Sequence, residues 1–108
     1  HVAMNLLQQN PKSANAYAAL VEVAEIRAEW LQKQNKPFED IVSDGLRNAR
    51  KALELNPSLS EIQAITGKLH SMLSRNQEAI ESLKKALAMN KNLEPKYQPL
   101  INQIQNQH

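Results

Sequence analysis

Histidines and a short row of glutamates are the residues of this chain that could do chemistry. The histidines are His1, His70 and His108, and none has a second ligand at the spacing of a metal site. A single histidine rarely forms a site on its own, so His70 is interpreted as a packing residue where two helices cross. The chain contains no cysteine, which excludes thiolate chemistry and a disulfide framework.

Glu22, Glu25 and Glu29 follow one another at three- and four-residue spacing. On a helix they would share one face, where carboxylates can hold a metal ion or transfer protons. The simpler interpretation is a solvated face, in which Glu29 pairs with Lys33 four residues further on. The sequence has neither a glycine-rich phosphate loop nor a Ser-His-Asp set. We therefore expect a protein that is not an enzyme and that has no cofactor and no metal.

The composition favours a helical domain with balanced charge. Two Gly and five Pro in 108 residues leave few breaks, and the low aromatic content requires a core of Leu, Ile, Val and Ala. The formal net charge is +2, and the Lys and Arg residues are scattered, so no footprint for nucleic acid or anionic lipid is indicated. No apolar stretch reaches the length of a membrane span and no signal-peptide pattern opens the chain, which favours the cytoplasm.

A repeated phrase organises the rest of the chain. Residues 51–53 read Lys-Ala-Leu, and the same three residues recur at 85–87, 34 residues later. A fixed period of this size is typical of stacked helical hairpins. The Asn-Pro pair at 56–57 also occurs at 10–11. We therefore interpret residues 1–11 as the end of a preceding repeat, and we expect the natural protein to be longer.

Apolar residues at three- and four-residue spacing predict a series of helices. Helices are expected at about residues 13–34, 37–55 and 58–72. A further helix is expected between the turn at 74–76 and residue 89, and a last one from residue 94 onward. Ser13 is the predicted N-cap of the first helix. Ser58 and Glu61 have the spacing of a capping box at the start of the third.

The helix at 13–34 carries two apolar stripes that join into one wide arc. The arc consists of Ala16, Tyr17, Ala19, Leu20, Val23, Ala24, Ile26, Ala28, Trp30 and Leu31. A helix with so wide an arc is expected to touch neighbours on two sides, with Gly45 and Ala49 making room for Trp30. The last helix has a single stripe, which is expected to close the end of a stack. That stripe is Tyr97, Leu100, Ile101 and Ile104.

Residues 60–93 resemble a tetratricopeptide repeat, a unit of 34 residues built from two antiparallel helices. Gly67 stands at the small position of the first helix. Ala79 and Ala86 stand at the small positions of the second, with Leu83 as the large residue between them. The resemblance implies an all-α solenoid of antiparallel helical hairpins.

Residues 14–57 resemble the same repeat with about ten additional residues around 28–40. Similar lengthened units occur in the helical-repeat regions that follow some bacterial serine/threonine kinases. The resemblance implies one domain over residues 1–108. Its parts are the end of a preceding repeat (1–11), a lengthened repeat (13–57), a standard repeat (58–92) and a capping helix (94–106).

In such stacks the first helices of the units line a concave groove that commonly takes a peptide segment of a partner. Carried over by position, the groove residues are Asn15, Ala18, Ala19, Glu22, Glu25, Ile26, Ala64, Ile65, Lys68, Ser71 and Met72. Some members clamp a terminal carboxylate with Lys and Asn, but Ala18 and Glu22 stand at those positions here. The acidic strip beside Ile26, Ile65 and Met72 suits a basic or mixed basic-apolar peptide.

Two other functions compete with peptide binding. RNA-binding helical repeats have a similar length, but they need basic grooves, and the acidic strip argues against them. A structural spacer or self-association module would use the open N-terminal face of the stack to pair with a second copy. The sequence thus predicts a non-catalytic protein-binding scaffold, with these two functions as alternatives.

Overall fold

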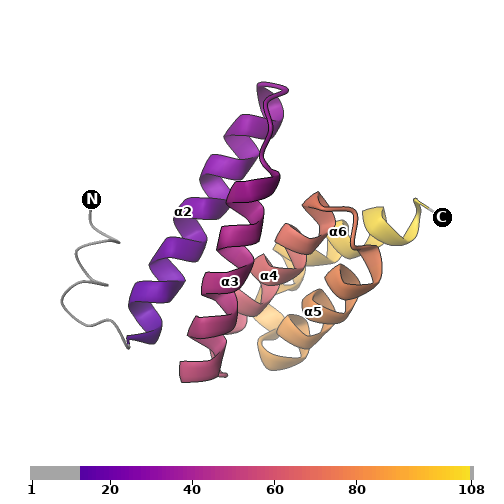
Figure 1. The fold of residues 1–108 in the computed structure, drawn as a ribbon. Coiled ribbons are helices and arrows are strands. Elements are labelled where there is room, and N and C mark those ends of the chain that lie inside the picture. The colour runs from indigo at the N-terminus through magenta and orange to yellow at the C-terminus, as the bar shows by residue number, and fades with distance from the viewer. Residues whose placement is uncertain (1–12, 108) are drawn as a thin grey trace.

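The computed structural model describes residues 13–107, and these residues form α-helices joined by short turns (Figure 1). The helices are α2 (Ala14–Lys33), α3 (Glu39–Leu55), α4 (Ser60–Met72), α5 (Asn76–Met89) and α6 (Glu94–Gln105), with the 3₁₀ turn η1 (Lys91–Leu93) before α6. Residues 13–107 contain no β-strand, so the predicted all-α fold is confirmed. The expected end of a preceding repeat at 1–11 lies outside the described residues.

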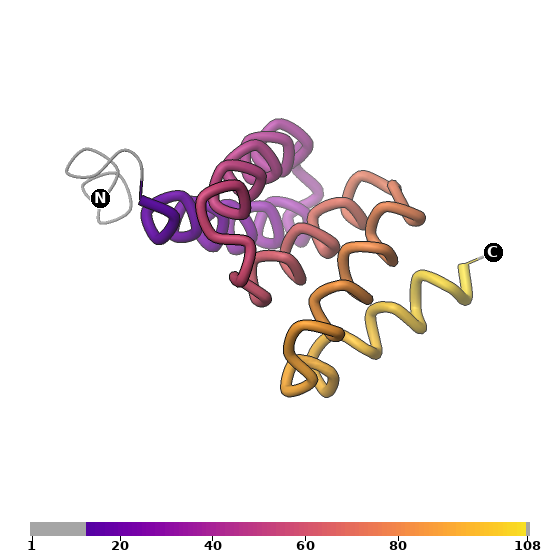
Figure 2. Tube along the Cα trace, turned by 90° about the horizontal axis from the view of Figure 1, so that it is seen from below, coloured from indigo at the N-terminus to yellow at the C-terminus, as the bar shows by residue number. Residues whose placement is uncertain are grey.

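The helices pair as antiparallel hairpins that stack side by side. α2 packs along α3, and α4 packs along α5. α4 also contacts both helices of the first hairpin, while α6 lies against α5 and the edge of α4 (Figure 2). The arrangement is an all-α helical repeat, and the single apolar stripe of α6 is buried in it through Tyr97, Ile101 and Ile104.

The interior consists of two clusters of buried side chains. The first core cluster joins α2, α3 and α4 and contains Ala18, Val21, Ala28, Val42, Ala49, Ala52, Ile62, Ile65 and Leu69. The second core cluster joins α4, α5, η1 and α6 and contains Ala64, Ala79, Leu83, Ala86, Leu93, Tyr97, Ile101 and Ile104. α4 contributes to both clusters. It is therefore the helix that holds the two hairpins together.

The second hairpin has the close helix crossing that its small residues predict. Ala79, Leu83 and Ala86 are fully buried. A Cβ at Gly67 would lie 2.7 Å from Leu83 Cγ and 2.9 Å from the carbonyl oxygen of Ala79. Because those distances are shorter than van der Waals contact, the two helices approach too closely for any side chain at this position.

The first hairpin differs from its prediction. Trp30 is 55% exposed and Ile26 is 66% exposed, whereas Val21 is fully buried. Gly45 approaches Ala24 and Leu69, so it does not make room for Trp30 as expected. Among the described residues, α3 and α4 cover the Val21 side of α2. Ile26 is five residues further along, roughly 140° around the helix, and faces away from them.

The two predicted N-caps have different outcomes. Ser13 caps α2, because its hydroxyl accepts a hydrogen bond from the amide of Ala16 at 3.3 Å. The capping box of Ser58 and Glu61 is wrong. α4 begins at Ser60 without a side-chain cap. The amide of Ser58 instead donates to Asn56 Oδ1 at 3.0 Å, which makes Ser58 part of the turn that ends α3.

Candidate functional site

One face of the stack is formed by α2, α4 and α6, the first helix of each hairpin and the capping helix. Two hollows lie on it. The N-terminal hollow has a volume of about 490 Å³ and is lined by Asn15, Ala18, Ala19, Glu22, Ser58, Leu59, Ser60, Glu61 and Ile62. The C-terminal hollow, of about 260 Å³, is lined by Glu29, Gln32, Lys68, Ser71, Met72, Asn76, Leu100, Gln103, Ile104 and Gln107.

An ion bridge joins α2 to α4 on this face. Lys68 Nζ lies 3.0 Å from Glu25 Oε2 and 3.1 Å from Glu29 Oε1. Burial alone would lower the pKa of Lys68, but hydrogen bonds to the two carboxylates and their charge raise it above its usual value. The Glu25 side chain is only 13% exposed. The one positive charge of Lys68 therefore offsets one of the three negative charges of the predicted acidic strip, and Glu29 pairs across to α4 rather than with Lys33.

Acidic character remains in the N-terminal hollow. Glu22 is exposed there, and none of the ion pairs formed among residues 13–107 involves it. Glu61 lies across the same hollow on α4 and makes a solvent-exposed contact of 3.4 Å with Lys96. Exposed ion pairs of this kind contribute little energy, so Glu61 is available to a competing cation. Ala19 and Leu59, which are partly exposed, give the hollow an apolar part.

The structure divides the predicted groove residues into three groups. Asn15, Ala18, Ala19 and Glu22 line the N-terminal hollow, and Lys68, Ser71 and Met72 line the C-terminal hollow. Glu25 forms the ion bridge with Lys68. Ala64 and Ile65 are buried in the core because α4 has neighbours on several sides, so neither can line a groove. Ile26 is exposed on α2 and lines neither hollow, so its place in the groove stays a prediction.

Some lining residues were missed by the sequence analysis. Glu61 had been assigned to a capping box that does not form. Gln103 and Gln107 line the C-terminal hollow from the C-terminal end of α6, which had been interpreted only as a cap. Their spacing of four residues, next to the apolar stripe, is the pattern that could have identified them.

Among residues 13–107, no group of three or more His, Asp or Glu side chains is arranged to hold a metal ion. None of the helices in this range is long and apolar enough to cross a bilayer. His70 lies on the opposite side of α4 from Lys68, and burial lowers its pKa.

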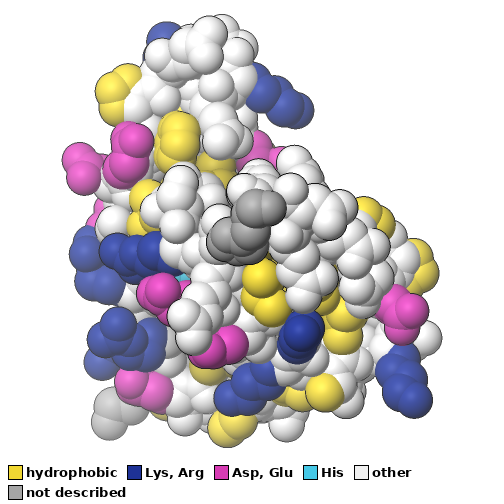
Figure 3. All heavy atoms as spheres, turned by 90° about the vertical axis from the view of Figure 1, so that its right-hand side faces the viewer, with side chains coloured by type: hydrophobic (Ala, Val, Ile, Leu, Met, Phe, Trp, Pro, Cys, Tyr) yellow, Lys and Arg dark blue, Asp and Glu magenta, His cyan; other side chains and the backbone are white. Residues whose placement is uncertain are grey.

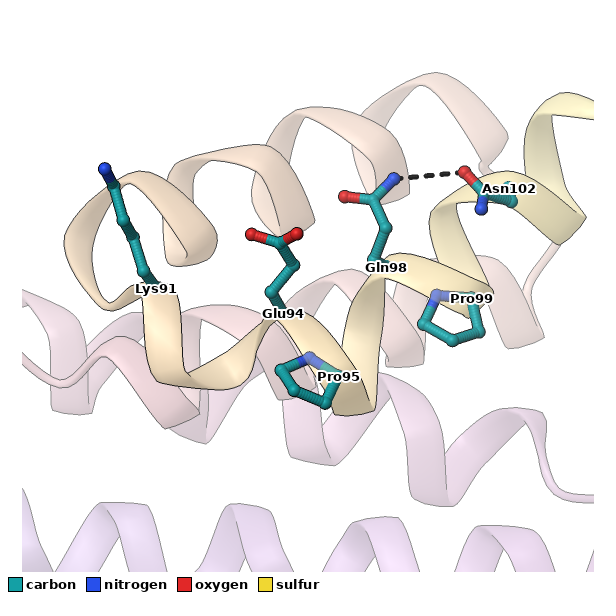
Figure 4. A pocket seen from close by; sticks show the side chains of 6 residues that line it. All are labelled: Lys91, Glu94, Pro95, Gln98, Pro99 and Asn102. Atoms are coloured by element: carbon teal, nitrogen blue, oxygen red, sulfur yellow. Dashed lines mark hydrogen bonds between the residues drawn. The ribbon is translucent and has the colours of Figure 1, made fainter.

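A further hollow lies along η1 and α6 (Figure 4). It has a volume of about 470 Å³ and is lined by Lys91, Glu94, Pro95, Gln98, Pro99 and Asn102. Gln98 Nε2 donates to Asn102 Oδ1 at 3.0 Å. All six residues come from one short segment, and in Figure 4 the prolines lie away from Lys91, Glu94 and Gln98. The two hollows lined by several helices are therefore the stronger candidates.

Comparison with known proteins finds one similar sequence of much greater length. The chain is 32% identical over 93 residues to the cellulose synthase operon protein C of Pseudomonas fluorescens (strain SBW25). The alignment covers 86% of this chain and 6% of that protein. No protein-family model matches the chain, and no solved structure matches it. The chain thus resembles a small region of a long protein.

Proposed function

We propose that this chain is a tetratricopeptide-like module that binds a segment of a partner protein without catalysis. The binding surface is the face formed by α2, α4 and α6. The observation that carries the proposal is the N-terminal hollow, where two carboxylates from different helices border a space with an apolar part. By its likeness to one region of a cellulose synthase operon protein C, the module would serve as an interaction region within a longer protein.

The charges in the hollow select the partner segment. Glu22 and Glu61 would receive a Lys or Arg side chain, and Ala19 and Leu59, which are partly exposed, would contact an apolar neighbour of that residue. The ion bridge at Lys68 offers little to a basic ligand, because Glu25 and Glu29 are already paired there. We therefore expect the basic residue of the partner to bind between Glu22, near the middle of α2, and Glu61, at the N-terminal end of α4.

Selection from a random peptide library tests this proposal. The wild-type domain should enrich peptides in which a basic residue stands next to an apolar one. The double variant Glu22→Lys, Glu61→Lys should bind the selected peptides at least about tenfold more weakly, because it reverses both charges that face the ligand. The affinities are measured by fluorescence polarisation.

Glu81→Lys is the control, because Glu81 is exposed on α5 and lines neither hollow. It should leave the affinity for the selected peptides nearly unchanged. Enrichment of peptides without basic residues, or equal binding by wild type and the double variant, would contradict the proposal.

A further inference from the structure

A cleft of about 380 Å³ lies on the side of α4 that faces away from the ion bridge. We name it the α3–α5 cleft, because these two helices form its walls and α4 forms its floor. It is lined by Leu46, Arg50, Leu53, Glu54, Gln63, Thr66, His70, Arg75 and Lys85. The floor residues Gln63, Thr66 and His70 recur at three- and four-residue spacing, so they form one stripe along α4.

The walls of the α3–α5 cleft carry an excess of positive charge. Arg50 from α3, Arg75 from the turn before α5 and Lys85 from α5 all line it, against the single carboxylate of Glu54. None of these three cations takes part in an ion pair formed within residues 13–107. Figure 3 shows Lys and Arg side chains beside a small area of histidine surface, with Asp or Glu side chains next to it as well. The cleft therefore presents cations that are free to meet an anion.

The floor contains a polar atom without a partner. Thr66 satisfies its own hydroxyl by donating to the Ile62 carbonyl at 2.8 Å. His70 Nδ1 is buried and has no hydrogen-bond partner among the described residues. Leaving a buried polar atom unpaired costs about 1–3 kcal/mol, and such atoms usually find a partner. Because Nδ1 is enclosed by protein, a ligand in the cleft would meet other atoms of His70.

The cleft also has an apolar wall. Leu46 and Leu53 of α3 are partly buried and pack against the first core cluster, and they line the cleft beside Arg50. A single inorganic anion would use the cations but leave this wall uncovered. No Phe, Tyr or Trp lines the cleft, so only His70 and the guanidinium groups of Arg50 and Arg75 could stack on a nucleic acid base there. The leucine wall favours a protein segment with an apolar side chain.

We propose that the α3–α5 cleft is a second binding site, which takes an acidic segment of a partner protein. Asp or Glu side chains of that segment pair with Arg50, Arg75 and Lys85, and a neighbouring apolar side chain packs on Leu46 and Leu53. Because this cleft and the N-terminal hollow lie on different sides of α4, the two sites bind partners of opposite charge independently.

Two synthetic peptides test the site, a fluorescein-labelled peptide of alternating Glu and Leu and its counterpart with Gln in place of Glu. Wild type should bind the Glu peptide and not the Gln peptide. Arg50→Gln with Arg75→Gln should weaken binding at least about tenfold, because charge-assisted pairs to carboxylates are lost. In NMR spectra, the His70 imidazole signals of wild type should move when the Glu peptide is added.

The matched control is Arg27→Gln with Lys33→Gln, which removes the same charge from exposed positions on α2. It should change the affinity by less than about twofold, because salt in the buffer screens charges on α2 that lie far from the cleft. Circular dichroism melts verify that both double variants fold. Equal weakening by the two double variants would mean unspecific attraction and would overturn the proposal.

Two further ligands separate the alternatives. If inorganic phosphate alone shifts the His70 signals while the Glu peptide does not, the cleft is a small-anion site and the proposal is wrong. If a single-stranded RNA binds and the Arg50→Gln, Arg75→Gln variant loses that binding, the cleft belongs to a nucleic acid and the proposal is equally wrong.

Discussion

The two hairpins differ in the length of their helices. α2 and α3 have 20 and 17 residues, whereas α4 and α5 have 13 and 14. At 1.5 Å per residue, α2 is about 10 Å longer than α4. Figure 1 shows the extra length as a tip that stands clear of α4, α5 and α6. Trp30 is near this tip, exposed, with Lys36 Nζ 5.3 Å from the centre of its ring.

The placement of neighbouring helices, and not the apolar content of a helix, decides which of its side chains are buried. α5 has α4 on one side and α6 on the other, so Leu83 is completely enclosed. α2 has a wider apolar arc than any other helix of the chain. Over residues 13–107 its neighbours are α3 and α4, and Ile26 and Trp30 of that arc remain exposed to solvent.

The largest effect is expected at the centre of the second hairpin. Leu83→Ala should lower the free energy of unfolding by about 2–5 kcal/mol, because it removes a fully buried side chain and leaves a cavity. Chemical denaturation monitored by circular dichroism measures the change. Leu55→Ala, at a position 48% exposed on α3, is the control and should cost far less. A cost below about 1 kcal/mol at Leu83 would mean that the α4–α5 packing is wrong.

A smaller effect separates the two glycines. Gly67→Ala should destabilise the fold by about 1–3 kcal/mol, because the new methyl group meets the backbone carbonyl of Ala79, which cannot move independently. At Gly45 the contacts are longer, with Ala24 Cβ at 3.0 Å and the flexible Leu69 Cδ1 at 3.1 Å, and no backbone carbonyl is among them. Alanine gains about 1 kcal/mol in helix propensity there, so Gly45→Ala should be close to neutral. If denaturant titrations show the same loss of unfolding free energy for both variants, the two hairpins do not differ in how closely their helices approach at the glycine.

The smallest effect concerns the helix starts. Ser13→Ala should cost about 1 kcal/mol, because the N-cap hydrogen bond to Ala16 is lost. Ser58→Ala should stay within about 0.5 kcal/mol, because the Ser58 hydroxyl caps nothing in the structure. Thermal melts of the two variants, recorded side by side, compare them directly. A larger loss of stability in Ser58→Ala than in Ser13→Ala would indicate that the capping box predicted from the sequence does form.

Local patterns in the sequence predicted the helices and much of the second hairpin. Three- and four-residue spacing located the helices to within a few residues, and it identified Leu83, Ala86, Ile101 and Ile104 as core. These results depend on periodicity along one helix, which a sequence displays directly.

Contacts between distant residues could not be predicted in this way. The hydrogen bond from Lys68 to Glu25 joins residues 43 positions apart in the sequence. The residue pattern around Lys68 does not indicate that Glu25 is its partner, and the pattern around Glu25 does not indicate Lys68. The predicted acidic strip was therefore overestimated. The α3–α5 cleft likewise combines residues from 46 to 85 whose separate patterns indicate only exposed or half-buried helix positions. Such sites depend on the angle at which one helix crosses another.

The exposed position of Trp30 determines what optical spectroscopy can observe in this protein. The chain contains a single tryptophan, and its indole is already largely in water in the native state. Its emission will change little when the two core clusters come apart, so intrinsic fluorescence is a poor probe of unfolding here. A molecule that covers the tip of the first hairpin will shift that emission, and the protein therefore carries its own unlabelled reporter at this one place.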